Sequence, residues 1–88
     1  MVRRRKHIQP RFGAERAFGD VLRQLRNNRK LSQEELGDVC NSDRTFVSML
    51  ERGLVSPTLR TIVKFSTALR VTPSELIRRT EKSSFYRI

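Results

Sequence analysis

Residues 32–53 have the sequence SQEELGDVCNSDRTFVSMLERG, which contains the start and stop signals of two short helices. Ser32 is followed three positions later by Glu35, the spacing of a capping box, so a helix is expected to begin at Ser32. Apolar residues then recur at spacings of three and four, which predicts one buried helix face. These residues are Leu36, Val39 and Cys40.

A tight polar turn is expected to end this helix. Asn41 tolerates the left-handed backbone that such a turn needs, and Ser42 offers the backbone competing hydrogen bonds. Asp43 is a suitable N-cap for a second helix, and Gly53 stands where a helix usually ends in a left-handed residue. The apolar stripe of the second helix is expected at Phe46, Val47 and Leu50. The stretch therefore predicts a helix, a turn and a second helix.

One helix is expected before this motif, from Ala14 or Glu15 to Asn28. Its apolar residues are spaced as on one face of a helix and are expected in the core. They are Phe18, Val21, Leu22 and Leu25.

Two more helices are expected after the motif. Thr58 is a suitable N-cap for the first of them, and Thr72 for the second, where Pro73 takes the first helical position and Glu75 completes a capping box. Helical spacing predicts that the first buries Leu59, Ile62, Val63, Ser66 and Leu69, and that the second buries Leu76 and Ile77.

Five helices with short loops and no strand-like alternation predict an all-α fold, a compact five-helix bundle. The chain has 88 residues, enough for one such domain. We expect it at residues 14–80, between a basic segment at 1–13 and a tail at 81–88. The basic segment has too few apolar residues to fold by itself and is expected to be a flexible arm. It is either a solvated tail or an arm that binds DNA phosphates or a minor groove.

Five short motifs, in this order, resemble the Xre family of helix-turn-helix proteins, which includes the Cro and cI-type phage repressors. They are SQEEL at 32–36, RTFVS at 44–48, ERG at 51–53, PTL at 57–59 and VTPSEL at 71–76. The resemblance extends from about Phe18 to Ile77. It implies a lambda-repressor-like bundle whose recognition helix, residues 43–52, enters a DNA major groove. The RTFVS stretch looks somewhat closer to the controller proteins of restriction-modification systems than to Cro-type repressors.

The resemblance also implies roles for single residues. The outward positions of the recognition helix would face the bases: Arg44, Thr45, Ser48 and Met49. Arg44 is expected to bond O6 and N7 of a guanine, with a phosphate contact as the alternative. A second set would contact the DNA backbone: Gln33, Asn41, Ser42, Asp43, Arg52 and Arg60. Arg26 and Glu51 are implied to form a largely buried ion pair that supports the recognition helix.

The charge of the chain independently favours a polyanionic partner. Nineteen Lys and Arg residues against nine Asp and Glu residues give a formal net charge of +10 and a pI near 11.4. The aromatic fraction is 7%, with no Trp, which argues against stacking on single-stranded nucleic acid and favours duplex DNA. A protein that is merely basic, without a nucleic-acid partner, is the alternative on charge alone.

Several other classes of function are not supported by the sequence. Cys40 is the only cysteine and is expected in the core, and His7 has no metal ligands at suitable spacing, so no metal site or cofactor is expected. No constellation of nucleophile, base or paired carboxylates indicates an enzyme. No apolar run is long enough for a membrane span, so a cytoplasmic protein is expected.

We therefore expect a bacterial or phage-encoded transcriptional regulator that binds a roughly palindromic operator as a homodimer. The tail at 81–88 is a candidate dimer contact, because Phe85, Tyr86 and Ile88 have no obvious place in a monomer core. Repression and activation are both compatible with the sequence. An antitoxin that binds a toxin partner and a non-specific basic nucleic-acid binder are the alternatives, and RNA polymerase is a further candidate partner.

Overall fold

The computed structural model describes residues 13–86, and every regular element in this part of the chain is a helix. The helices are α1 (Ala14–Asn28), α2 (Gln33–Cys40), α3 (Arg44–Glu51), α4 (Leu59–Ala68) and α5 (Pro73–Lys82). The predicted all-α fold of five helices is confirmed. None of these helices has the length and apolar character that crossing a bilayer requires. The predicted basic arm lies outside the described residues, apart from Gly13.

The predicted N-cap residues of α2, α3, α4 and α5 all form side-chain caps. Ser32 forms a full capping box: its Oγ accepts from the Glu35 amide at 3.0 Å, and its own amide donates to Glu35 Oε1 at 2.7 Å. Asp43 Oδ1 accepts from the Phe46 amide at 2.8 Å, and Thr58 Oγ1 accepts from the Thr61 amide at 3.1 Å. Each cap satisfies a backbone amide that has no acceptor inside its helix.

The capping box predicted at the start of α5 is only half correct. Thr72 Oγ1 accepts from the Glu75 amide at 3.0 Å, and Pro73 takes the first helical position as predicted. The Glu75 carboxylate, however, forms salt bridges to Arg78 and Arg79, one turn further along the helix. This carboxylate is therefore turned towards cations and away from the cap. The hydrogen bond from Arg79 lowers the pKa of Glu75 below its ordinary value.

The turn between α2 and α3 has the predicted conformation. Asn41 is left-handed, with φ of 56° and ψ of 43°, and the Ser42 amide donates to the Gly37 carbonyl at 2.8 Å. This backbone bond closes the end of α2. It brings Asp43 directly to the start of α3.

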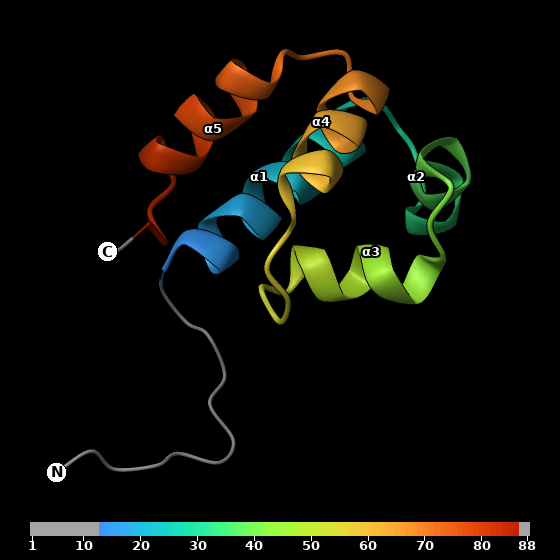
Figure 1. Cartoon of the computed structure of the whole chain (residues 1–88), viewed down its shortest axis with the longest axis horizontal. Helices are drawn as coiled ribbons and strands as arrows, with labels where there is room; N and C mark the ends of the chain where they lie inside the picture. The colour runs from blue at the N-terminus through green and yellow to red at the C-terminus, as the bar shows by residue number, and fades with distance from the viewer. Residues whose placement is uncertain (1–12, 87–88) are drawn as a thin grey trace, which may run out of the picture.

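The helices are arranged around α1, which packs against α3 and α5 (Figure 1). The helix α2 packs against α3 and α4, and α4 packs against α5. In Figure 1, α3 lies along one edge of the molecule, and no other helix covers its outer side. The packing therefore holds α3 from one side only and leaves the other side open to a partner.

Most of the predicted core is confirmed. The buried apolar cluster takes residues from all five helices: Phe18, Val21, Leu22, Leu25, Leu36, Cys40, Val47, Leu50, Phe65, Leu69 and Leu76. Phe65 is fully buried but was not among the predicted core residues, because the predicted apolar face of its helix included Val63 in place of Phe65. Ser66 is buried as predicted, and its hydroxyl donates to the Val63 carbonyl at 2.9 Å.

Four residues predicted in the core are exposed, and these predictions were wrong. They are Val39 at 63%, Leu59 at 76%, Val63 at 44% and Ile77 at 42% exposed. On α2, the small residue Gly37 is buried in place of Val39, and on α5, the polar residue Thr80 is buried in place of Ile77. The buried side of α4 is centred on Phe65 and Ser66, which turns Val63 outward. Leu59 is the first residue of α4 and is exposed, because no neighbouring helix covers it there. Periodicity does not reveal where neighbouring helices end.

Two backbone features bring α1 and α3 very close together. A Cβ added at Gly19 of α1 would lie 2.3 Å from the Leu50 carbonyl oxygen and 2.5 Å from that of Glu51. Gly53, just after α3, has φ of +73°, and a Cβ there would lie 2.8 Å from Arg16 Cα. The crossing of the two helices therefore depends on glycine on both sides.

The C-terminal tail packs onto the start of α1. The Gly13 amide donates to the Phe85 carbonyl at 2.8 Å, and the Arg16 guanidinium carbon lies 4.0 Å from the centroid of the Phe85 ring. Ser83 Oγ donates to Asp20 Oδ2 at 3.4 Å. The expectation that Phe85 has no place in the monomer was therefore wrong, because the ring is half-buried against a cation. Residues 81 and 82, assigned to the tail, belong to α5.

Candidate nucleic-acid interface

The outer side of α3 carries the residues predicted to face DNA bases. Arg44 and Thr45 are exposed, while Ser48 and Met49 are half-buried. Val47 and Leu50 alternate with them and are fully buried. The helix therefore separates a core side from an open side, as the spacing of its apolar residues predicted.

The residues of the turn before α3 are partly committed to the turn itself. Ser42 Oγ donates to the Cys40 carbonyl at 3.3 Å, and one Asp43 carboxylate oxygen accepts the Phe46 amide. Asn41 is exposed. The turn thus holds its own geometry with the side chains of Ser42 and Asp43 and offers Asn41 to the outside.

A buried ion pair connects α3 to α1, as the family resemblance implied. Arg26 Nε donates to Glu51 Oε2 at 2.6 Å, and Arg26 Nη2 donates to Glu51 Oε1 at 2.9 Å. The Glu51 side chain is 2% exposed and that of Arg26 is 12% exposed. The hydrogen bond to Glu51 raises the pKa of Arg26 above its ordinary value, with desolvation acting in the opposite direction. The pair has the two-bond geometry that suits guanidinium and carboxylate.

Gln33 joins this pair, which the sequence did not predict. Its Nε2 donates to Glu51 Oε1 at 3.1 Å, and Arg26 Nη1 donates to the Leu31 carbonyl at 2.9 Å. The carboxylate of Glu51 is thus the meeting point of α1, α2 and α3. Gln33 and Glu51 are 18 residues apart, so no local pattern could have indicated this contact.

The remaining predicted backbone contacts lie at the end of the motif and in the next helix. Arg52 is the exposed C-cap of α3, and Arg60 is exposed in the first turn of α4. The loop between them is tied to α1, because Ser56 Oγ donates to Glu15 Oε2 at 2.7 Å. This hydrogen bond lowers the pKa of Glu15 below its ordinary value of 4.5.

Cys40 has no features of a reactive thiol. Its side chain is buried, its Sγ lies 3.9 Å from the Lys64 carbonyl oxygen, and burial raises the pKa of its thiol. The prediction of a core cysteine is confirmed. No group of three or more potential metal ligands occurs within residues 13–86, and His7 lies outside them.

Comparison with known proteins identifies relatives that share this architecture. Control protein C.BamHI from Bacillus amyloliquefaciens is 41% identical over 61 residues, which cover 68% of this chain and 75% of that protein. The crystal structure of the restriction-modification controller protein C.AhdI from Aeromonas hydrophila is 43% identical. Its TM-score is 0.67, over 69% of this chain and 92% of that chain.

A second solved structure is the P22 c2 repressor in complex with a synthetic operator. It is 27% identical, with a TM-score of 0.64, and the match covers 67% of this chain and 89% of the repressor chain. The family model HTH_3, described as helix-turn-helix, matches residues 22–76, which include α2, the turn, α3 and α4. The chain therefore belongs to the HTH_3 helix-turn-helix family, within which it resembles restriction-modification control proteins and Cro- and cI-type repressors.

Proposed function

We propose that this chain, a sequence-specific DNA-binding transcriptional regulator, binds a roughly palindromic operator as a homodimer, with the outer side of α3 in the major groove. The observation that carries the proposal is the geometry of α3. Its outer side is uncovered (Figure 1), while Glu51 at its last turn is bonded to both α1 and α2. A rigidly held helix with one free polar side suits insertion into a major groove.

Base recognition is assigned to the open side of α3. Arg44, in the first turn and exposed, is the residue for bidentate bonding to guanine O6 and N7. Thr45 and Ser48 supply hydroxyl groups for bases or nearby phosphates. Met49 supplies an apolar contact for a thymine methyl group.

Backbone binding is assigned to the residues that flank this helix. Gln33 stands at the start of α2, where unpaired amides and the positive end of the helix dipole favour a phosphate. Because the side-chain amide of Gln33 also donates to Glu51, a phosphate bound at Gln33 would contact the same hydrogen-bond network that holds α3. The other proposed backbone residues are Asn41, Ser42, Asp43, Arg52 and Arg60. Asp43 would contribute through its backbone, because its carboxylate is the α3 cap and carries the wrong charge.

The role of Arg44 is tested with duplexes that the wild-type protein selects from a random pool at fixed salt. Arg44→Ala is expected to cost about 1–3 kcal/mol on the selected duplex and to leave binding to random duplex nearly unchanged. Arg23→Ala removes an exposed arginine from α1, outside the proposed DNA and dimer surfaces. It is the matched control and is expected to affect binding to both duplexes equally. Fluorescence anisotropy measures both affinities.

A non-specific binder would give a different result. It would bind selected and random duplexes alike, whereas a regulator is expected to differ by roughly 10³ or more. Deleting the basic residues 3–6 is expected to weaken binding to both duplexes and to flatten the dependence of the affinity on salt concentration. If Arg44→Ala behaved like this deletion, base recognition by Arg44 would be wrong.

Dimerisation is proposed through α5 and the tail. One recognition helix makes too few contacts for operator-level affinity, so a two-fold pair is needed. Ile77 on α5 is exposed and apolar, and the half-buried Phe85 and Tyr86 continue the same C-terminal region. Deleting residues 85–88 and substituting Ile77→Ser are each expected to raise the dimer dissociation constant in sedimentation equilibrium. Unchanged sedimentation of both variants would contradict this surface.

The relatives support a specific regulatory setting. C.BamHI and C.AhdI are named as control proteins, the latter of a restriction-modification system, and both are more than 40% identical to this chain. We propose that the chain controls the genes of such a system. The selected duplex sequence tests this, because it should recur upstream of the restriction-modification genes that accompany the chain.

A further inference from the structure

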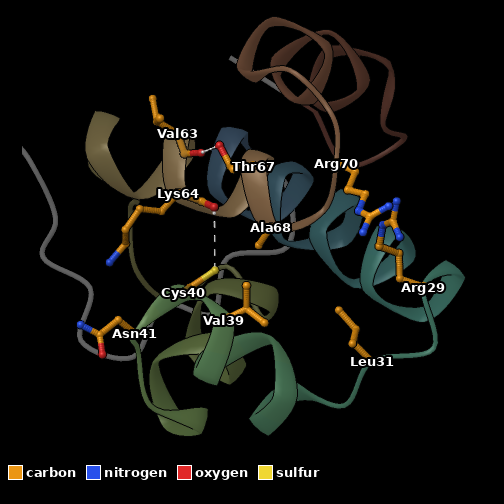
Figure 2. A pocket seen from close by; sticks show the side chains of 10 residues that line it. All are labelled: Arg29, Leu31, Val39, Cys40, Asn41, Val63, Lys64, Thr67, Ala68 and Arg70. Atoms are coloured by element: carbon orange, nitrogen blue, oxygen red, sulfur yellow. Dashed lines mark hydrogen bonds between the residues drawn. The ribbon is translucent and has the colours of Figure 1, made fainter.

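A groove that does not involve α3 lies between the end of α1, α2 and α4 (Figure 2). Its volume is about 690 Å³. Leu31, Val39 and Val63 line it, and the two valines are the exposed residues that the sequence had predicted in the core. Apolar side chains that are exposed together in one groove favour binding of a partner with an apolar group, which would cover them from water.

The rim of the same groove is basic. Arg29, Lys64 and Arg70 line it, and Figure 2 shows the Arg29 and Arg70 side chains extending towards each other. Arg29 is held in place, because its Nε donates to the Leu69 carbonyl at 3.1 Å. No salt bridge pairs any of the three with a carboxylate within residues 13–86. Two neighbouring guanidinium groups repel each other, and an anion between them would remove that cost.

We propose that this groove docks a short segment of a partner protein in which a carboxylate side chain stands next to an aliphatic one. The carboxylate would pair with Arg29 and Arg70, and the aliphatic side chain would cover Val39 and Val63. Apolar contact and charge pairing in one groove suit a protein segment, because both are supplied by neighbouring side chains of one peptide.

Charge excludes the N-terminal segment of this chain as the occupant. The segment at 1–13 holds five Lys and Arg residues and no Asp or Glu, so the basic rim would repel it. The phosphates of duplex DNA would pair with the three cations but would not cover the valines, because phosphates offer no apolar surface. The lining residues include none from α3, and the groove shares one residue, Asn41, with the proposed DNA-backbone contacts.

The test uses a capped twelve-residue peptide of repeating Glu-Glu-Leu-Leu as the probe, titrated into the ¹⁵N-labelled full chain. Amide shifts are expected around Val39, Lys64 and Arg70. Arg70→Glu is expected to weaken peptide binding about tenfold, because it reverses one of the two charges that would pair with the carboxylate. Lys82→Glu, a charge reversal on α5, is the control and is expected to change the peptide affinity by less than about twofold. Val39→Ser tests the apolar part and is expected to weaken binding about fivefold.

Two control peptides separate the two halves of the site. Replacing Glu by Gln, or Leu by Ser, is expected to abolish binding in each case. Arg70→Gln replaces Arg70→Glu if circular dichroism shows that the charge reversal unfolds the chain, and a smaller loss is expected. Equal peptide affinity for the wild type, the Arg70 variant and Val39→Ser would overturn the proposal. An Arg70→Glu variant that lost affinity for duplex DNA more strongly than Lys82→Glu would also overturn it, because the groove would then be a phosphate surface.

Discussion

Glu51→Ala is expected to lower the free energy of unfolding by about 3–5 kcal/mol, the usual loss when one partner of a buried ion pair is removed. The Glu51 carboxylate accepts three hydrogen bonds, two from Arg26 and one from Gln33. Its removal leaves the Arg26 guanidinium in a largely buried position without a counter-charge. Urea denaturation followed by circular dichroism measures the loss.

Two further variants separate this pair from a general effect of removing charge. Glu75→Ala breaks the more exposed pairs with Arg78 and Arg79 and is expected to change the stability much less, because water screens those pairs. The double variant Arg26→Met with Glu51→Met is expected to recover much of the loss, since it leaves no buried charge unpaired. A denaturation midpoint of Glu51→Ala equal to that of the wild type would contradict the role of the pair.

Gly19→Ala is expected to lower the free energy of unfolding by about 3 kcal/mol, the upper end of the usual cost of overpacking. The added Cβ would lie 2.3 Å from the Leu50 carbonyl oxygen, so α1 and α3 would have to separate. Backbone atoms are in contact here, and no flexible side chain is available to yield. We also expect weaker binding to the selected duplex, because α3 would shift relative to the rest of the bundle.

The sign of this change is decisive. In a helix, alanine is favoured over glycine by about 1 kcal/mol, so a site without close contact would be stabilised by the substitution. Asn27→Ala, at an exposed position of the same helix, is the matched control and is expected to be neutral or slightly stabilising. A Gly19→Ala variant more stable than the wild type would show that the helices are not in close contact there.

The motif was predictable from the sequence because its determinants are local. The caps at Ser32 and Asp43 join groups three residues apart, and the left-handed residues at Asn41 and Gly53 depend on the residue type. Tertiary neighbours have little influence on such short-range bonds. The family resemblance supplied one long-range element, the pair of Arg26 and Glu51.

The extent of burial was less predictable, because it depends on which helix lies opposite. Helical spacing located an apolar stripe on each helix but could not define its edges, so Val39, Val63 and Ile77 were placed inside the core. Phe65 was left out for the same reason. At the candidate site, the assignment of Arg44 and Thr45 to the open side of α3 needed only helical spacing and agrees with their exposure.

The sequence by itself determined the five helices, the N-cap residues of four of them, the turn and the family, because these depend on bonds within one turn and on motif spacing. Only the tertiary structure decided the contact of Gln33 with Glu51, the packing of Phe85 on Arg16 and the groove beside Val39. Each of these joins residues that are distant in the chain, and a pair separated by 18 to 69 positions leaves no local pattern to detect. They form because folding brings the helices together, and it is the packing of whole helices that selects which side chains meet.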